Sequence, residues 1–158
     1  MNKAIFLDRD GVINRKVPEK DFVKNVDELI YLPKVKEIVG KLKQKGYIVI
    51  IISNQSGINR GIINKENLEK INAKLKKDLG VDAIYYCPHL PEENCSCRKP
   101  KTGLIEKAVK DFNVDIKLSL FIGDNDFDMM AGKSAGCTTI MVDSNVGLAQ
   151  IEEQLEVV

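Results

Sequence analysis

The chain has 158 residues, with 24 basic and 23 acidic side chains, so its formal net charge is +1. This balance argues against proteins that gather nucleic acid or anionic membranes through a strong positive field. No apolar run approaches the roughly 20 residues of a membrane span, and the first strand begins too early for a signal peptide to precede it. We therefore expect one domain over residues 1–158, acting in the cytoplasm as a monomer.

Apolar runs predict five strands along the chain, and helical patterns separate them. The strands are expected at residues 4–7, 47–52, 83–86, 120–122 and 139–142. The run at 47–52 is apolar throughout, as in strands that are covered on both faces. This order of elements predicts an α/β protein with a doubly wound, mostly parallel five-stranded sheet and helices on both of its faces.

The predicted helices carry their own start and stop signals. Pro33 suits a first helical position, and Asn64 and Thr102 are expected to cap the helices that follow them. Gly80 and Gly136 suit helix C-termini. The helices are expected over residues 33–46, 64–80, 102–112, 126–135 and 148–155.

Polar groups follow the first four predicted strands. They are Asp8 and Asp10 after the first strand, Ser53-Asn54-Gln55-Ser56 after the second, Cys87 and His89 after the third, and Asp124 after the fourth. Parallel sheets of this kind bind ligands at the carboxyl ends of their strands. The sequence therefore predicts a functional site at that edge of the sheet.

The acids at these strand ends have the chemistry of a magnesium site. Asp8 and Asp10 repel each other unless a cation or a proton lies between them, and with Asp124 they offer the oxygen ligands that Mg²⁺ prefers. Asp128 follows Asp124 by one helical turn and can share its face, although a surface acid is an equal alternative. A solvated acidic turn is the alternative for Asp8 and Asp10. The charge of Lys99 suits the binding of a phosphate group, and the alternative is a lysine that is simply exposed to solvent.

Three of the four cysteines and the only histidine lie within eleven residues. The pattern joins Cys87, His89, Cys95 and Cys97, and three thiolates with one imidazole complete a tetrahedral structural Zn²⁺ site. Disulfides or free thiols are the alternatives, and a cytoplasmic location disfavours disulfides. Cys137 is interpreted as a core thiol. Since Arg98 and Lys99 follow the loop directly, we expect zinc to hold their backbone in place.

These residues resemble the four motifs of the haloacid dehalogenase superfamily. Residues 6–14 resemble the first motif, Ser53 the second, Lys99-Pro100 the third, and Gly123-Asp124 with Asp128 the fourth. The resemblance implies a Rossmann-like fold and Mg²⁺-dependent hydrolysis of a phosphomonoester. It implies that Asp8 becomes an aspartyl phosphate, that Asp10 moves the proton and offers its backbone carbonyl to Mg²⁺, and that Ser53 and Lys99 bind the phosphoryl group. Asp124 would complete the Mg²⁺ site.

The cysteine loop resembles one branch of this superfamily, whose members hydrolyse heptose bisphosphate or histidinol phosphate. Residues 53–58 are closer to the heptose enzymes, which implies removal of the 7-phosphate of D-glycero-D-manno-heptose 1,7-bisphosphate. The short stretch 90–94 is closer to the histidinol-phosphate enzymes, and this activity is the alternative. The resemblance implies substrate contacts from Asn54, Gln55, Ser56 and Arg98. Weaker candidates for the site are Arg60, Lys101, Asn125 and Asp128.

No stretch between the motifs is long enough for a cap domain, so loops are expected to set specificity. The candidate loops are residues 15–21, residues 56–61 and the cysteine loop, and Arg15 and Lys16 are expected to contribute. A receiver-type signalling domain also carries an acidic Mg²⁺ site and a phosphorylated aspartate, but its acid pair and acceptor lie on different strands. A nucleic-acid end phosphatase is a third candidate, against which the neutral charge counts.

Overall fold

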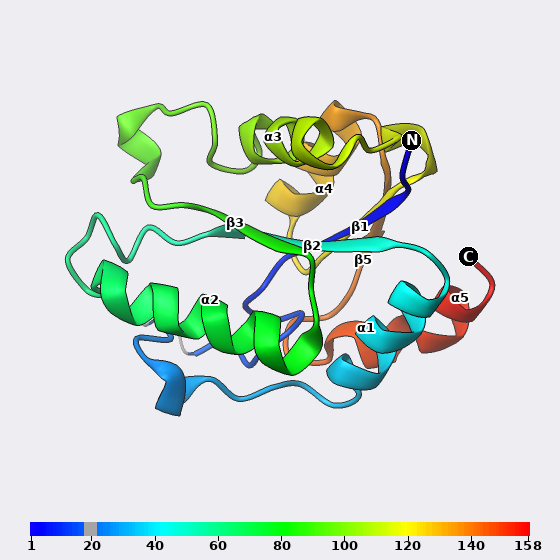
Figure 1. Ribbon diagram of the computed structural model, residues 1–158. Coiled ribbons are helices and arrows are strands. Elements are labelled where there is room, and N and C mark those ends of the chain that lie inside the picture. The colour runs from blue at the N-terminus through cyan, green and yellow to red at the C-terminus, as the bar shows by residue number, and fades with distance from the viewer. Residues whose placement is uncertain (18–21) are drawn as a thin grey trace.

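Five parallel strands form the centre of the molecule (Figure 1). The computed structural model describes residues 1–17 and 22–158. The strands are β1 (Ala4–Leu7), β2 (Ile48–Asn54), β3 (Ala83–Cys87), β4 (Leu120–Gly123) and β5 (Thr138–Met141), in the order β3-β2-β1-β4-β5. The predicted doubly wound parallel sheet is confirmed, with strand ends shifted by at most two residues.

Helices cover both faces of the sheet (Figure 1). One face carries α1 (Val35–Gln44), α2 (Lys65–Leu79) and α5 (Glu152–Glu156), and the other carries α3 (Gly103–Phe112) and α4 (Asp126–Ala135). Short 3-10 helices lie at Val26–Glu28, Pro91–Glu93, Ile116–Leu118 and Gly147–Ile151. In the described part of the chain, no helix is long and apolar enough to cross a membrane.

The two apolar cores follow from the alternation of side chains along each strand. In β1, Ile5 and Leu7 belong to the core beneath α1 and α2, whereas Ala4 and Phe6 belong to the core beneath α3 and α4. All four side chains are fully buried. Because β1 is covered on both faces, its backbone is rigidly held where the chain continues into Asp8.

The helix ends agree with the predicted signals in most places. Asn64 caps α2 by accepting a hydrogen bond from the Asn67 N–H (2.7 Å), and Gly80 and Gly136 end their helices with positive φ. Thr102 precedes α3 without a side-chain capping bond. The first N–H of α3, from Gly103, instead donates to the Ser96 carbonyl in the cysteine loop (3.0 Å).

Two helical predictions were inaccurate. Pro33 lies outside α1, because Lys34 adopts a left-handed conformation (φ 64°) and separates it from the first turn. The helix expected over residues 148–155 divides into a 3-10 segment, Gly147–Ile151, and α5.

The strand order places the functional edge at β1 and β4. The chain runs from β1 outward through β2 and β3, and then returns to the other side of β1 as β4. Ligands bind where the strand order reverses in this way, outside the carboxyl ends of the strands. Asp8 follows β1 and Asp124 follows β4, so both acids lie at this switch point.

Replacing either of two helical glycines by alanine is predicted to change stability, in opposite directions. A Cβ at Gly40 in α1 would meet nothing within 4 Å, whereas one at Gly132 in α4 would lie 2.5 Å from Thr139 Cγ2 and 2.9 Å from Phe121 Cβ. We expect Gly40→Ala to raise the free energy of unfolding by about 0.5–1 kcal/mol and Gly132→Ala to lower it by about 1–3 kcal/mol. Urea unfolding of both variants measures this; equal effects would contradict the close packing of α4.

Candidate active site

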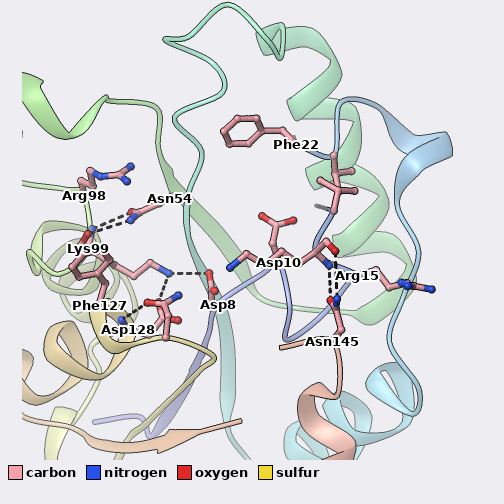
Figure 2. Close-up of a pocket in the computed structure, with 14 residues that line it drawn as sticks. Asp8, Asp10, Arg15, Phe22, Asn54, Arg98, Lys99, Phe127, Asp128 and Asn145 are labelled. Carbon is pink, nitrogen blue, oxygen red and sulfur yellow. Dashed lines mark hydrogen bonds and ion pairs between the residues drawn. The ribbon is translucent and has the colours of Figure 1, made fainter. Parts of the chain in front are cut away.

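A cavity of about 700 Å³ opens at the carboxyl ends of the strands. Figure 2 shows Asp8 and Lys99 pointing toward each other in it, with Asp128 beside them. Asp10, Asn54 and Arg98 also line the cavity. The structure thus brings together predicted residues that are up to 120 positions apart in the sequence, from Asp8 to Asp128.

The Lys99 ammonium group is the centre of this arrangement. It lies 2.9 Å from Asp8 Oδ1 and 2.7 Å from Asp128 Oδ1, and it donates to the Ile52 carbonyl (2.8 Å). Lys99 is 3% exposed and Asp128 is completely buried. Burial alone would lower the pKa of Lys99, but Asp8 and Asp128 outweigh it and raise the pKa. These ion pairs favour the charged form of Lys99.

Asp8, Asp124 and Asp128 form an acidic cluster around this cation. One carboxylate oxygen of each lies within 4.8 Å of the others. Burial raises the pKa of Asp8 well above its usual range, and the neighbouring Asp128 and Asp124 raise it further against the opposing effect of Lys99. Lys99 and the more exposed Lys16, whose Nζ lies 3.8 Å from Asp124, do not neutralise three carboxylates, so the donor set and the charge both suit an added divalent cation.

Asp124 is held at the edge of the cluster by its neighbours. Ser144 Oγ and Asn125 Nδ2 donate to its carboxylate, and Lys16 Nζ lies 3.8 Å from Oδ2. A Cβ at Gly11, where φ is 89°, would overlap Oδ2 of Asp124. Glycine is therefore required at position 11 both for the backbone conformation and for the approach of this carboxylate.

Asp10 has different partners from Asp8, although only one residue separates them. Arg9 Nη2 (2.9 Å) and Asn14 Nδ2 (3.0 Å) donate to Oδ1, and Gln55 Nε2 (3.0 Å) donates to Oδ2. Burial would raise the pKa of Asp10, but Arg9 and the two amides together lower it. The side chain of Asp10 is outside the acidic cluster, which leaves its backbone carbonyl as the predicted metal ligand.

The residues at the end of β2 and just after it divide between support and the cavity. Ser53 Oγ accepts from Gln55 Nε2 (2.6 Å), and both residues are buried beside Asp10. Asn54 lines the cavity, but its amide accepts from the Lys99 N–H (3.0 Å) and donates to the Lys99 carbonyl (3.2 Å). Ser56 accepts from Arg60 (3.3 Å), and neither of them is among the cavity-lining residues.

The predicted zinc ligands converge on one point. Cys87 Sγ lies 3.0 Å from Cys97 Sγ and 3.6 Å from Cys95 Sγ, and His89 Nδ1 lies 3.2 Å from both Cys87 and Cys97. These separations approach the edge of a tetrahedron, about 3.8 Å, for Zn–S bonds of about 2.3 Å. Burial would raise the pKa of Cys95, but the backbone N–H groups of Arg98 and Cys97 lower it to about 6. The donor set fits a structural zinc ion.

The cysteine loop is joined directly to the cavity. The Arg98 N–H donates to Cys95 Sγ (3.4 Å), and Arg98 Nη1 donates to the His89 carbonyl (3.4 Å). Lys101 Nζ donates to Asn94 Oδ1 (2.8 Å), so this lysine braces the loop and lies away from the cavity. The loop therefore fixes the backbone immediately before Lys99.

Comparison with known proteins identifies the family. Residues 3–147 match the family model for polynucleotide kinase 3 phosphatase. A curated D-glycero-beta-D-manno-heptose-1,7-bisphosphate 7-phosphatase from Helicobacter pylori is 42% identical over 140 residues, which cover 85% of this chain and 79% of that protein. The chain belongs to the haloacid dehalogenase-like phosphatases.

Other relatives of this phosphatase agree. A D-glycero-alpha-D-manno-heptose-1,7-bisphosphate 7-phosphatase from Campylobacter jejuni is 40% identical, and the match covers 89% of this chain and 81% of that protein. The crystal structure of D,D-heptose 1,7-bisphosphate phosphatase from B. bronchiseptica, complexed with magnesium and phosphate, has a TM-score of 0.84, 34% identity and 98% coverage of both chains. The predicted superfamily and its fold are thereby confirmed.

Several residues of the phosphatase site were missed by the sequence analysis. Arg9 is 1% exposed and pairs with Asp10. Ser144 and Asn145 follow the fifth strand, where the strand-end rule applied to the first four strands would have found them. Asn145 accepts from the Lys16 N–H (2.7 Å) and lines the cavity with Arg15 and Lys16. The rest of the predicted 15–21 loop, residues 18–21, lies outside the described residues.

Asp128→Asn tests whether the carboxylate of Asp128 positions Lys99. Asparagine keeps an acceptor for the Asp124 N–H, which Asp128 Oδ2 accepts at 3.2 Å, but it removes the charge that faces Lys99. We expect kcat to fall by about 10- to 100-fold, as is typical for groups that orient active-site residues. The control is Asp126→Asn, an exposed acid of the same helical turn. Full activity in Asp128→Asn would contradict this role.

Proposed function

We propose that this phosphatase removes the 7-phosphate of D-glycero-D-manno-heptose 1,7-bisphosphate through an aspartyl-phosphate intermediate on Asp8. The observation that carries the proposal is the contact of Asp8 with the buried cation Lys99 in a cavity that Asp10 also lines. A nucleophile, a phosphate-binding cation and a proton carrier are the groups that phosphoryl transfer requires.

The proposed reaction has two steps that share the same residues. In the first, a carboxylate oxygen of Asp8 attacks phosphorus, the bond from phosphorus to the sugar oxygen breaks, and Asp10 gives that oxygen a proton. In the second, water attacks phosphorus, Asp10 accepts its proton, and the bond to Asp8 breaks to release inorganic phosphate. Lys99 donates to the phosphoryl oxygens in both steps, and we propose that Ser53 does so too.

The environment of Asp10 suits both of its proposed tasks. Arg9 and its other donors favour the ionised form, which is the base that the second step needs. A phosphate group bound beside Asp10 brings negative charge, which raises the pKa of a carboxyl group and favours the proton-bearing form needed in the first step. The bound phosphate thus favours the acid, and transfer of that proton to the leaving oxygen in the first step leaves Asp10 as the base for the second.

We propose two metal sites with separate tasks. Asp8, Asp124 and the backbone carbonyl of Asp10 would hold Mg²⁺, which supplies neutralising charge to the phosphoryl group when bound. Asp128 is committed to Lys99, and we assign Asn125 a supporting role because its side chain caps α4 and contacts Asp124. Cys87, His89, Cys95 and Cys97 would hold Zn²⁺, with no position left for a catalytic water.

The charges of the cavity favour a bisphosphate over histidinol phosphate. Arg15, Lys16 and Arg98 line the cavity in addition to Lys99. These cations attract a second phosphate, whereas they repel the amine of histidinol phosphate. The relatives named above act on the alpha or beta form of the heptose bisphosphate, so the family covers both anomers.

We further propose that the chain acts as one domain over residues 1–158, as a cytoplasmic monomer. Its substrate would be a small sugar phosphate and not nucleic acid or a membrane, since a net charge of +1 provides no field to gather a polyanion. Phosphate bound to Asp8 would turn over and not persist, because Asp10 is poised to activate water. This distinguishes the proposal from a receiver domain.

Phosphate release in the presence of Mg²⁺ tests the proposed substrate. We expect kcat/KM for the heptose 1,7-bisphosphate to exceed that for L-histidinol phosphate by at least about 100-fold. Histidinol phosphate has no second phosphate to pair with the other cations of the cavity. Asp8→Asn should lower kcat by about 10⁴-fold or more, as loss of a nucleophile does. Preference for histidinol phosphate would refute the bisphosphate proposal, and full activity in Asp8→Asn would refute the mechanism.

Cys95→Ser tests whether zinc holds the phosphate-binding cations. We expect the variant to lose bound zinc and to lower kcat by up to about 100-fold, the effect of a displacement of about 1 Å at a catalytic group. Zinc is measured by elemental analysis of the purified protein. The control is Cys137→Ser, because Cys137 is outside the cluster and donates only to the Gly132 carbonyl. Zinc-free protein with full activity would contradict this role.

A further inference from the structure

The geometry points to Phe127 as a specificity-determining residue whose ring packs against the carbon skeleton of the sugar phosphate. This inference rests on the proposed function, because it assumes a substrate with a carbon skeleton larger than its reacting phosphate. In this proposal, the aromatic ring contacts the carbon part of the substrate, and the cations of the cavity contact its phosphates.

Phe127 is exposed although it is a large apolar residue. Its side chain is 54% exposed and belongs to neither apolar core. It lines the cavity that holds Asp8 and Lys99, and Figure 2 shows it on the side of the cavity where Lys99 and Asp128 lie. Covering apolar surface favours binding, and about half of the surface of Phe127 is still available to a ligand that enters the cavity.

The ring is carried on a rigid platform. Asn125 Oδ1 accepts from the Asp128 N–H (3.1 Å) and caps the first turn of α4, in which Phe127 lies. Asp128 anchors the same turn through its ion pair with Lys99 and by accepting from the Asp124 N–H. The backbone of Phe127 is therefore fixed relative to Lys99, so little order has to be gained when a ligand meets it.

The electrostatics of the ring determine which part of a substrate it accepts. The face of an aromatic ring is negative and its edge is positive. A phosphate dianion is repelled by such a face, whereas the weakly positive C–H groups of a sugar are not. With the reacting phosphoryl group on Lys99, Phe127 favours the carbon skeleton beside it, and Arg98 or Arg15 remains for a second phosphate.

The same helix offers a matched control. Met130 lies one turn after Phe127 and is similarly exposed, at 51%. Among the described residues that line the cavity, Met130 is absent. A change at Met130 therefore removes comparable exposed apolar surface from α4 without touching a ligand in the cavity.

The experiment compares Phe127→Ala, Phe127→Leu and Met130→Ala with the parent enzyme on two substrates. One is the heptose 1,7-bisphosphate, and the other is acetyl phosphate, which reaches Asp8 but is too short to cover the ring. Inhibition of acetyl phosphate hydrolysis by the bisphosphate also measures its binding when turnover is slow. We expect Phe127→Ala to raise KM for the bisphosphate about five- to tenfold, with kcat/KM for acetyl phosphate changed less than about twofold.

Phe127→Leu should retain most of the affinity, and Met130→Ala should match the parent on both substrates. Unchanged bisphosphate affinity in Phe127→Ala, or equal losses on both substrates, would overturn the role of Phe127 and leave the proposed function standing. An equal loss in Met130→Ala would overturn it too, since the effect would then belong to α4 as a whole. A parent enzyme that neither binds nor hydrolyses the bisphosphate would overturn both proposals.

Discussion

The site depends on one buried ammonium group that faces more negative charge than it can neutralise. Lys99 contacts Asp8 and Asp128, and Asp124 completes the cluster. Buried ions are costly unless they are paired. Lys99 therefore requires its carboxylate partners to be in place, and those carboxylates require Lys99. This requirement ties the end of β1, the end of β4, the first turn of α4 and the segment before α3 to one point. The remaining excess of negative charge makes the site receptive to a divalent cation.

The backbone of Lys99 is held as firmly as its side chain. Asn54, at the end of β2, makes hydrogen bonds to both the N–H and the carbonyl of Lys99. On the other side, the cysteine loop contacts Arg98 through Cys95 Sγ and receives the first N–H of α3 at the Ser96 carbonyl. The sheet and the proposed zinc site therefore position the same peptide. A zinc ion bound by the cysteine loop would therefore act on Lys99 through this backbone.

The parts of the site that follow from chain order could be predicted, and the parts that follow from side-chain packing could not. Asp8 and Asp124 were found because parallel strands end at one edge, a rule that needs only the positions of the strands. The same rule at the fifth strand would have found Ser144. The burial of Arg9 depends on contacts between distant segments, and so do the hydrogen bonds of the Asn54 side chain to the backbone of Lys99. Lys101 was a weaker candidate than Lys99 in the sequence, and its side chain contacts the cysteine loop.

Arg9 explains why two neighbouring acids behave differently. Asp8 is buried and Asp10 is partly buried; burial and nearby acids raise the pKa of Asp8, whereas Arg9 leads the groups that lower the pKa of Asp10. Arg9 lies at a bend just after β1, and its guanidinium donates to Asp10 Oδ1 through Nη2 (2.9 Å) and Nε (3.3 Å), so its charge acts directly on Asp10. In the proposed mechanism, Asp10 becomes ionised when it gives its proton to the leaving oxygen, so a phosphate on Asp8 would have a base beside it. Such an arrangement would favour turnover of the proposed phosphoenzyme over its storage.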